Sequence, residues 1–95
     1  MPKRMTEQIK DAAVENMVKN MVVLRTMLDL SQEELATLIG VGRQTLVAIE
    51  NKKRKMTWNT FLSLLFVFSQ NKETSFLLEV FGIYTPLMKE IYSGF

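Results

Sequence analysis

The chain has 95 residues, of which 47% are hydrophobic, and its formal net charge at pH 7 is only +2. It contains no cysteine and no histidine, which excludes disulfides, thiolate metal sites and the usual catalytic triads. The longest uninterrupted apolar run, residues 64–68, is far shorter than the roughly 20 residues that cross a bilayer. We therefore expect one domain over residues 1–95, located in the cytoplasm and not in a membrane, with no metal and no cofactor.

The N-terminal third has the apolar spacing of a helix. The pattern begins at Met5 or Thr6 and continues to Leu28 without an interior glycine or proline. Its apolar members are Ile9, Ala13, Met17, Met21, Leu24 and Leu28. The pattern predicts one long helix, and a break near Asn16 or Asn20 is the alternative.

A second helix is predicted to begin at Gln32. Ser31 and Glu34 have the spacing of a capping box, in which each side chain bonds the backbone N–H of the other residue. The apolar stripe of this helix is expected to consist of Leu35, Leu38 and Ile39. Ala36 is small enough to let another helix approach, and Gly40 suits the left-handed conformation that ends a helix.

The next helix is predicted to begin at Arg43 and to present a polar first turn. Leu46 and Ile49 have the spacing of its inward face, which leaves Arg43 and Gln44 on the outside. Residues 43–55 contain five cations and one anion, whereas the rest of the chain has seven cations and nine anions. The positive charge is therefore concentrated on this helix and on the loop that follows it.

Three further helices are predicted in the C-terminal half. Thr57 caps a nearly apolar helix that continues to Phe68, and a fifth helix ends at Gly82. The fifth helix is indicated by Phe76, Leu77, Val80 and Phe81. Thr85 and Pro86 are typical of the start of a short last helix. Its apolar stripe contains Tyr84, Leu87, Met88, Ile91, Tyr92 and Phe95.

The segment 30–53, LSQEELATLIGVGRQTLVAIENKK, resembles the helix-turn-helix of phage lambda repressor, Cro and the XRE-type regulators. The similarity extends over about residues 18–70. It is carried by Leu35, Ala36, Ile39, Gly40, Val41, Leu46 and Ile49. The resemblance implies an all-α, lambda repressor-like bundle of about five helices. Residues 5–17 and 71–95 would be helical extensions at the two ends.

Two residues depart from the family pattern. Gly42 stands where serine or threonine usually caps the recognition helix, and Lys52 stands where glycine usually ends it. Glycine is an acceptable N-cap, and we expect Asn51 to make the left-handed exit from the helix.

The resemblance implies that the helix from Arg43 reads DNA in the major groove. The expected base contacts are Arg43, Gln44, Thr45, Val47 and Ala48. A guanidinium matches the O6 and N7 atoms of guanine, and a carboxamide matches the N6 and N7 atoms of adenine. The expected phosphate contacts are Gln32, Lys52, Lys53, Arg54 and Lys55. For each of these residues the alternative is an ordinary solvated surface side chain.

Arg25 and Glu50 match a pair that joins the first and third helices of the family through a partly buried ion pair. We interpret the pair as structural. Direct contact of Arg25 with a phosphate is the alternative, and the two roles are compatible because the guanidinium has several donors.

The expected function is that of a DNA-binding transcriptional regulator, acting as a homodimer on a palindromic operator in double-stranded DNA. Dimerisation is assigned to Tyr84, Leu87, Ile91 and Phe95, and packing of these residues on their own subunit is the alternative. Two other functions stay open, namely the DNA-binding antitoxin of a toxin-antitoxin pair and a protein-interaction module that has kept the fold. An enzyme is disfavoured because the carboxylates are scattered over helix surfaces.

Overall fold

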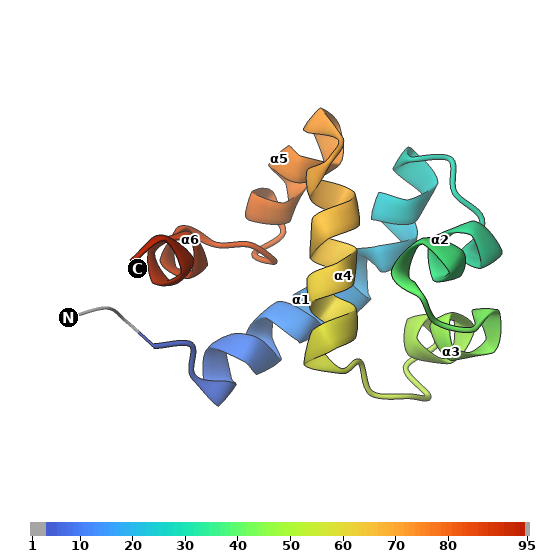
Figure 1. The fold of residues 1–95 in the computed structure, drawn as a ribbon, viewed down its shortest axis with the longest axis horizontal. Helices are drawn as coiled ribbons and strands as arrows, with labels where there is room; N and C mark the ends of the chain where they lie inside the picture. The colour runs from blue at the N-terminus through green and yellow to red at the C-terminus, as the bar shows by residue number, and fades with distance from the viewer. Residues whose placement is uncertain (1–3, 95) are drawn as a thin grey trace.

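The computed structural model describes residues 4–94 as six α-helices without a strand in this range (Figure 1). The helices are α1 (Glu7–Met27), α2 (Gln32–Ile39), α3 (Arg43–Glu50), α4 (Trp58–Ser69), α5 (Lys72–Val80) and α6 (Pro86–Ser93). In Figure 1, α4 crosses α1 at the centre, with α2 and α3 on one side and α5 and α6 on the other. The predicted all-α bundle is confirmed. None of the described helices is long and apolar enough to cross a membrane.

Helix α1 is continuous over 21 residues, so the alternative of a break in its middle is wrong. Thr6 caps it by accepting a hydrogen bond from the backbone N–H of Ile9. The side chains of Asn16 and Asn20 do not interrupt the helix. Asn20 Nδ2 donates to the carbonyl of Asn16 at 2.8 Å, and Asn16 Nδ2 donates to the carbonyl of Gly82 at 3.1 Å. The long N-terminal helix is thereby tied to the C-terminal part of the chain.

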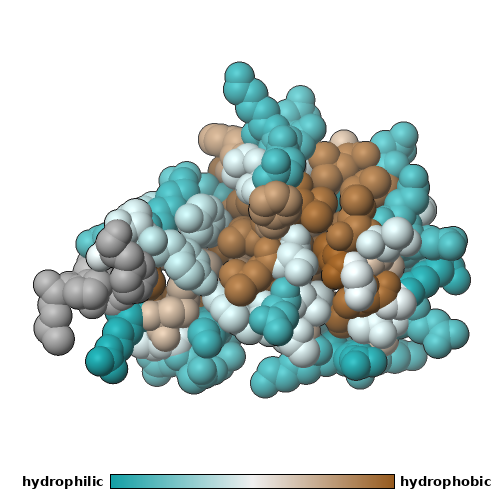
Figure 2. Space-filling view, viewed as in Figure 1, coloured by the Kyte–Doolittle hydropathy of each residue, from teal (hydrophilic) through white to brown (hydrophobic). Residues whose placement is uncertain are grey.

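One hydrophobic core joins all six helices. Helix α1 packs against α3 and α4, α2 packs against α3 and α4, and α5 packs against α4. The largest side chains with almost no exposed surface are Met17, Met21, Leu24, Leu35, Leu46, Ile49, Phe61, Leu64, Phe68, Leu78, Ile83 and Met88. Figure 2 shows that hydrophobic side chains also reach the surface over and beside α4, with hydrophilic side chains around them.

The expected inward position of Leu38 is wrong, since this side chain is 59% exposed. Leu35 and Ala36 are the buried residues of α2, and Ile39 is partly buried. The inward face of α2 is centred on Leu35 and Ala36, which contact the neighbouring helices. Leu38 lies on the solvent side of this face.

The inward face of α5 also differs from the predicted one. Thr74 and Leu78 are buried, whereas Phe76 and Val80 are exposed. The hydroxyl of Thr74 is satisfied inside the protein because it donates to the carbonyl of Phe68 at 2.6 Å. A hydrogen-bonded threonine therefore takes a core position that the hydrophobic pattern alone assigned to a phenylalanine.

The last helix packs on its own subunit through part of its predicted dimer surface. Ile91 is only 3% exposed within the single chain, so its assignment to a dimer interface needs correction. Burial in its own subunit removes Ile91 from any surface that a partner could contact. Tyr84 is partly buried and Leu87 is exposed. Phe95 lies outside the described residues.

Candidate nucleic-acid interface

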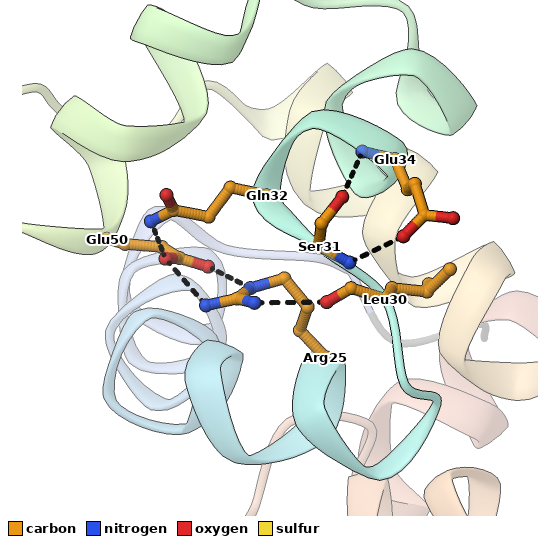
Figure 3. Close-up of polar contacts among 6 residues, drawn as sticks. All are labelled: Arg25, Leu30, Ser31, Gln32, Glu34 and Glu50. Carbon is orange, nitrogen blue, oxygen red and sulfur yellow. Dashed lines mark hydrogen bonds and ion pairs between the residues drawn. The ribbon is translucent and has the colours of Figure 1, made fainter.

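The start of α2, the first helix of the helix-turn-helix, is fixed by local hydrogen bonds (Figure 3). Glu34 N donates to Ser31 Oγ at 3.0 Å, and Ser31 N donates to Glu34 Oε1 at 2.9 Å, which completes the predicted capping box. The bond from the backbone N–H of Ser31, and secondly its side chain, lower the pKa of Glu34 below the ordinary value of 4.5. At its other end, α2 stops at Gly40, which has a φ of 77°.

Helix α3 projects its polar first turn into solvent. Leu46 and Ile49 are buried against the core, whereas Arg43 and Gln44 are exposed at the opposite side. Within residues 4–94 neither Arg43 nor Gln44 makes a side-chain hydrogen bond or ion pair. Gly42 precedes the helix and has no side chain with which to cap its first amides. The leading end of α3 therefore offers free donors and acceptors to a ligand.

The side-chain positions beyond the first turn are less open. Thr45, Val47 and Ala48 are partly buried. Their contacts with DNA remain predictions.

A buried polar network locks the other end of α3 to α1. Arg25 Nε donates to Glu50 Oε2 at 3.0 Å, and Arg25 Nη2 donates to Glu50 Oε1 at 3.4 Å. Arg25 Nη1 donates to the carbonyl of Leu30 at 3.0 Å. The Glu50 side chain is only 3% exposed and that of Arg25 is 15% exposed. Arg25 and Glu50, the expected structural pair, are thus brought together, and the pair joins the first helix to the third.

Gln32 belongs to the same network. Its Nε2 atom donates to Glu50 Oε1 at 2.8 Å, so the first residue of α2 is bonded to the last residue of α3 (Figure 3). The second N–H of this amide makes no hydrogen bond within residues 4–94. The resemblance implies that Gln32 bonds a phosphate and braces the first turn of α3, whereas the observed bond reaches Glu50 at the last residue of α3.

Four cations follow α3 on a tightly turned loop. Lys52, Lys53, Arg54 and Lys55 are all exposed. The backbone N–H groups of Lys53 and Arg54 both donate to the carbonyl of Ala48, at 2.8 and 3.2 Å, and Met56 anchors the end of the loop in the core. The basic loop is therefore held at a fixed position beside the C-terminal end of α3.

The left-handed residue of this loop is Lys52, with a φ of 61°, and not Asn51, whose φ is −86°. The expectation for Asn51 is thus wrong by one position. The family glycine and Lys52 occupy the same place in the sequence pattern, so the lysine adopts the conformation that glycine would adopt more easily.

One basic residue near this loop was missed by the sequence analysis. Lys19 of α1 lines a groove of about 410 Å³ together with all four loop cations. Its position on a helix far from the motif gave no signal in the sequence, because only the fold brings α1 beside the loop. Its ammonium group lies 3.3 Å from Glu15, so it adds less free charge than the loop residues do.

Comparison with known families identifies the same region. Residues 23–57 match the family model described as helix-turn-helix, which spans the C-terminal end of α1, both helices of the turn and the basic loop. No curated protein and no solved structure matches the chain significantly.

Proposed function

Because the chain belongs to the XRE-type, lambda repressor-like helix-turn-helix family, a DNA-binding class, we propose that it is a sequence-specific transcriptional regulator that binds a palindromic operator as a homodimer. The observation that carries the proposal is the contrast between the two ends of α3. Its last residue, Glu50, is fixed in a buried network, while Arg43 and Gln44 project without partners in the described part of the chain.

In this function Arg43 and Gln44 determine the preferred sequence. Arg43 is suited to guanine and Gln44 to adenine, because both side chains can make two parallel hydrogen bonds to a base edge. Thr45 would contact a phosphate or a thymine methyl group. Val47 and Ala48 would add apolar contacts with thymine.

The basic loop supplies affinity without sequence preference. Lys52, Lys53, Arg54 and Lys55 neutralise phosphates, and the free N–H of Gln32 and the first amides of α2 bind one more. If the four cations each neutralise one phosphate, they contribute about −3 to −4 to the slope of log affinity against log salt concentration.

A homodimer is required because one recognition helix contacts too few base pairs. Two copies related by a two-fold axis place their helices in half-sites about 34 Å apart. The operator then has the same two-fold symmetry as the protein.

The test is selection of bound duplexes from a random pool, with the parent chain and with Arg43→Ala and Gln44→Ala. We expect a palindromic motif whose specified bases relax in each variant, with a loss of discrimination of about 1–3 kcal/mol for each bidentate contact. Gln70→Ala, which removes an exposed glutamine from the far end of α4, is the matched control and should select the parent motif. Enrichment of no sequence by the parent chain would reject the proposal and favour the protein-interaction module.

A further inference from the structure

The groove between α1 and the basic loop combines apolar side chains with positive charge, and we call it the α1–loop groove. Its volume of about 410 Å³ lies within the range of about 300–1,000 Å³ that is typical of small-molecule sites. Its apolar lining consists of Val14 and Val18 on α1, Ile49 on α3 and Met56 after the loop. Ile49 and Met56 are buried and the two valines are partly buried, so the apolar surface lies inside the groove.

The charged lining of the α1–loop groove is strongly positive. All four loop cations contribute to it, together with Lys19 of α1. Glu15 is the one carboxylate among the lining residues, and it is 3.3 Å from the ammonium group of Lys19. Five cations and one carboxylate give the lining a net charge of +4. Within residues 4–94 none of the four loop cations has an ion-pair partner, so the groove attracts an anion.

The backbone that carries these cations is already ordered. The N–H of Lys52 donates to the carbonyl of Ile49 at 3.0 Å, and the N–H of Lys53 donates to the carbonyl of Ala48 at 2.8 Å. A ligand that binds here therefore does not have to order the loop first, which reduces the entropy that binding would otherwise cost.

The apolar lining distinguishes this groove from a surface made only for DNA. A phosphate of the duplex interacts with the cations but gains nothing from Val14 and Val18, which stay in contact with water beside it. A hydrocarbon group removes these side chains from water. Cations around an apolar groove thus indicate a ligand that has an anionic end and an apolar end.

A second groove, of about 400 Å³, continues the first one along α1. The two grooves share Val14, Lys55 and Met56, and the second one extends to Trp58. The charges of the second groove are balanced, because it is lined by two cations and two carboxylates, namely Lys10, Lys55, Glu7 and Asp11. The anionic end of a ligand is therefore attracted to the first groove, and its apolar end is directed toward Trp58.

We propose that the α1–loop groove binds a small amphipathic anion, with a carboxylate or phosphate head on a hydrocarbon group. The head pairs with the loop cations, and the hydrocarbon group covers Val14, Val18 and Met56. The ligand occupies cations that the proposed function assigns to DNA phosphates, so its binding weakens DNA binding. This regulatory effect rests on the proposed function, whereas the binding of the ligand itself does not.

The groove beside Leu38 shows that groove size alone does not select this ligand. Its volume is similar, about 440 Å³, but its charged lining consists of Glu33 and Glu34 without a cation. Two carboxylates repel an anionic head. The proposal is therefore specific to the groove beside the basic loop.

The first test measures direct binding by isothermal titration calorimetry, without DNA, with octanoate as the probe. Octanoate is expected to bind at least about 10-fold more tightly than acetate, which lacks the hydrocarbon chain, and than octanol, which lacks the charge. Failure of the parent chain to bind octanoate, or equal affinities for octanoate and octanol, would overturn the proposal.

Variants locate the site of octanoate binding. Val18→Asn and Lys53→Gln should each raise the dissociation constant of octanoate at least about 5-fold, because one alters the apolar lining and the other removes a cation. The matched controls are Val22→Asn, one turn further along α1, and Lys72→Gln on α5, and both should bind octanoate as the parent chain does. Parent-like affinity of Val18→Asn and Lys53→Gln would contradict the proposed site. Far-UV circular dichroism checks that each variant stays helical.

The position of the hydrocarbon chain can be followed by fluorescence. Trp58 is the one tryptophan of the chain, and its side chain is partly buried. Saturation with octanoate should shift its emission to shorter wavelength, because the hydrocarbon chain replaces water beside the ring. Unchanged emission at saturation would contradict the direction proposed for the apolar end.

Vesicles of phosphatidylglycerol distinguish a free ligand from a membrane surface that carries the same head group chemistry. The parent chain and Val18→Asn should bind these vesicles equally, because a flat bilayer surface contacts the exposed cations and not the lining of the groove. A loss of vesicle binding in Val18→Asn as large as its loss of octanoate binding would assign the groove to a membrane lipid and overturn the proposal.

The last measurement separates the ligand site from the proposed function. Saturating octanoate should make the salt slope of operator binding less steep by about 1 if it neutralises one loop cation, with equal acetate as the control for ionic strength. Val18→Asn should bind the operator as the parent chain does and lose this response to octanoate. A parent chain that prefers no duplex but still binds octanoate would reject the proposed function alone, whereas operator binding that saturating octanoate leaves unchanged would reject the regulatory effect alone.

Discussion

The α2–α3 and α5–α6 corners turn in the same way and lead into helices that are fixed by different contacts. Each turn contains a left-handed glycine, Gly40 with a φ of 77° and Gly82 with a φ of 70°. The residue after each glycine donates to the carbonyl five positions earlier, that of Ala36 at 3.0 Å and that of Leu78 at 2.8 Å. The same hydrogen bonding ends both preceding helices.

The residues after each turn make the difference. At the first corner, Arg43 and Gln44 are exposed and the helix is held from behind by a buried polar network. At the second corner, Ile83 is buried in the turn and α6 is held by the buried side chains of Met88 and Ile91. A common turn therefore leads in both corners to a helix that buries two apolar side chains, and the difference is the buried polar network that fixes α3 in addition.

The largest expected effect is the loss of the network behind α3. Glu50→Ala leaves the guanidinium of Arg25 and the amide of Gln32 without their buried acceptor, so the free energy of unfolding should fall by about 3 kcal/mol in urea titrations. Asn16→Ala, which removes the single bond to Gly82 at the other corner, should cost only about 1 kcal/mol. Normal unfolding of Glu50→Ala combined with a changed DNA preference would contradict the structural assignment of the Arg25–Glu50 pair.

The two glycines should respond differently to alanine. A Cβ at Gly40 meets nothing within 4 Å. Gly40→Ala should therefore lower the free energy of unfolding by about 1 kcal/mol, which is the cost of placing alanine in a left-handed backbone. A Cβ at Gly82 lies 3.0 Å from Asn16 Nδ2, so Gly82→Ala should cost more, about 2 kcal/mol by thermal or urea unfolding. In an Asn16→Ala background, Gly82→Ala should lower the free energy of unfolding by no more than Gly40→Ala does. Equal losses for the two single variants would show that the Asn16 contact does not distinguish the corners.

Features that depend on short-range spacing were predictable from the sequence. The caps at Ser31, Thr57 and Thr85 and the turns at Gly40 and Gly82 each follow from a few neighbouring residues. They depend on backbone chemistry that is the same in any fold. The candidate recognition helix was found in this way.

Features that depend on which helices meet were not predictable. Leu38 and Phe76 have helical spacing, but the direction of the core at each helix is set by neighbours that are distant in the sequence. The bond from Gln32 to Glu50 spans 18 positions, and Lys19 reaches the basic loop only because α1 lies beside it. Periodicity predicts that a helix has an inner face but does not fix its exact orientation when the helix has only eight or nine residues.

A smaller effect is expected at Lys52, where stability and DNA affinity should change in opposite directions. Lys52→Gly relieves a left-handed backbone with a φ of 61° and should raise the free energy of unfolding by about 0.5–1 kcal/mol. It also removes one cation, which should make the salt slope of DNA binding less steep by about 1. Lys53→Gly is the matched control, because it removes a neighbouring charge without relieving a positive φ. A gain in stability from both variants would refute the conformational explanation.

The smallest effect should come from the carboxylate in the cap at the start of α2, the helix that leads into the α2–α3 corner. The backbone N–H of Ser31 lowers the pKa of Glu34 below 4.5, so the ionised carboxylate is bound more strongly in the folded state. Its stabilising contribution is complete at pH values above about 4.5 and is lost as the pH falls through the lower folded value. Glu34→Gln keeps an acceptor for the same N–H but does not titrate, so its melting temperature should be slightly below that of the parent chain at pH 7, and this difference should shrink as the pH falls through the lowered pKa of Glu34. At the start of α6 the N-cap Thr85 accepts a bond from the backbone N–H of Met88, whose side chain does not titrate, so Met88→Leu should give the same difference in melting temperature at each pH. If the difference for Glu34→Gln were also independent of pH, the contribution of Ser31 and Glu34 would come from hydrogen-bond geometry alone and not from charge.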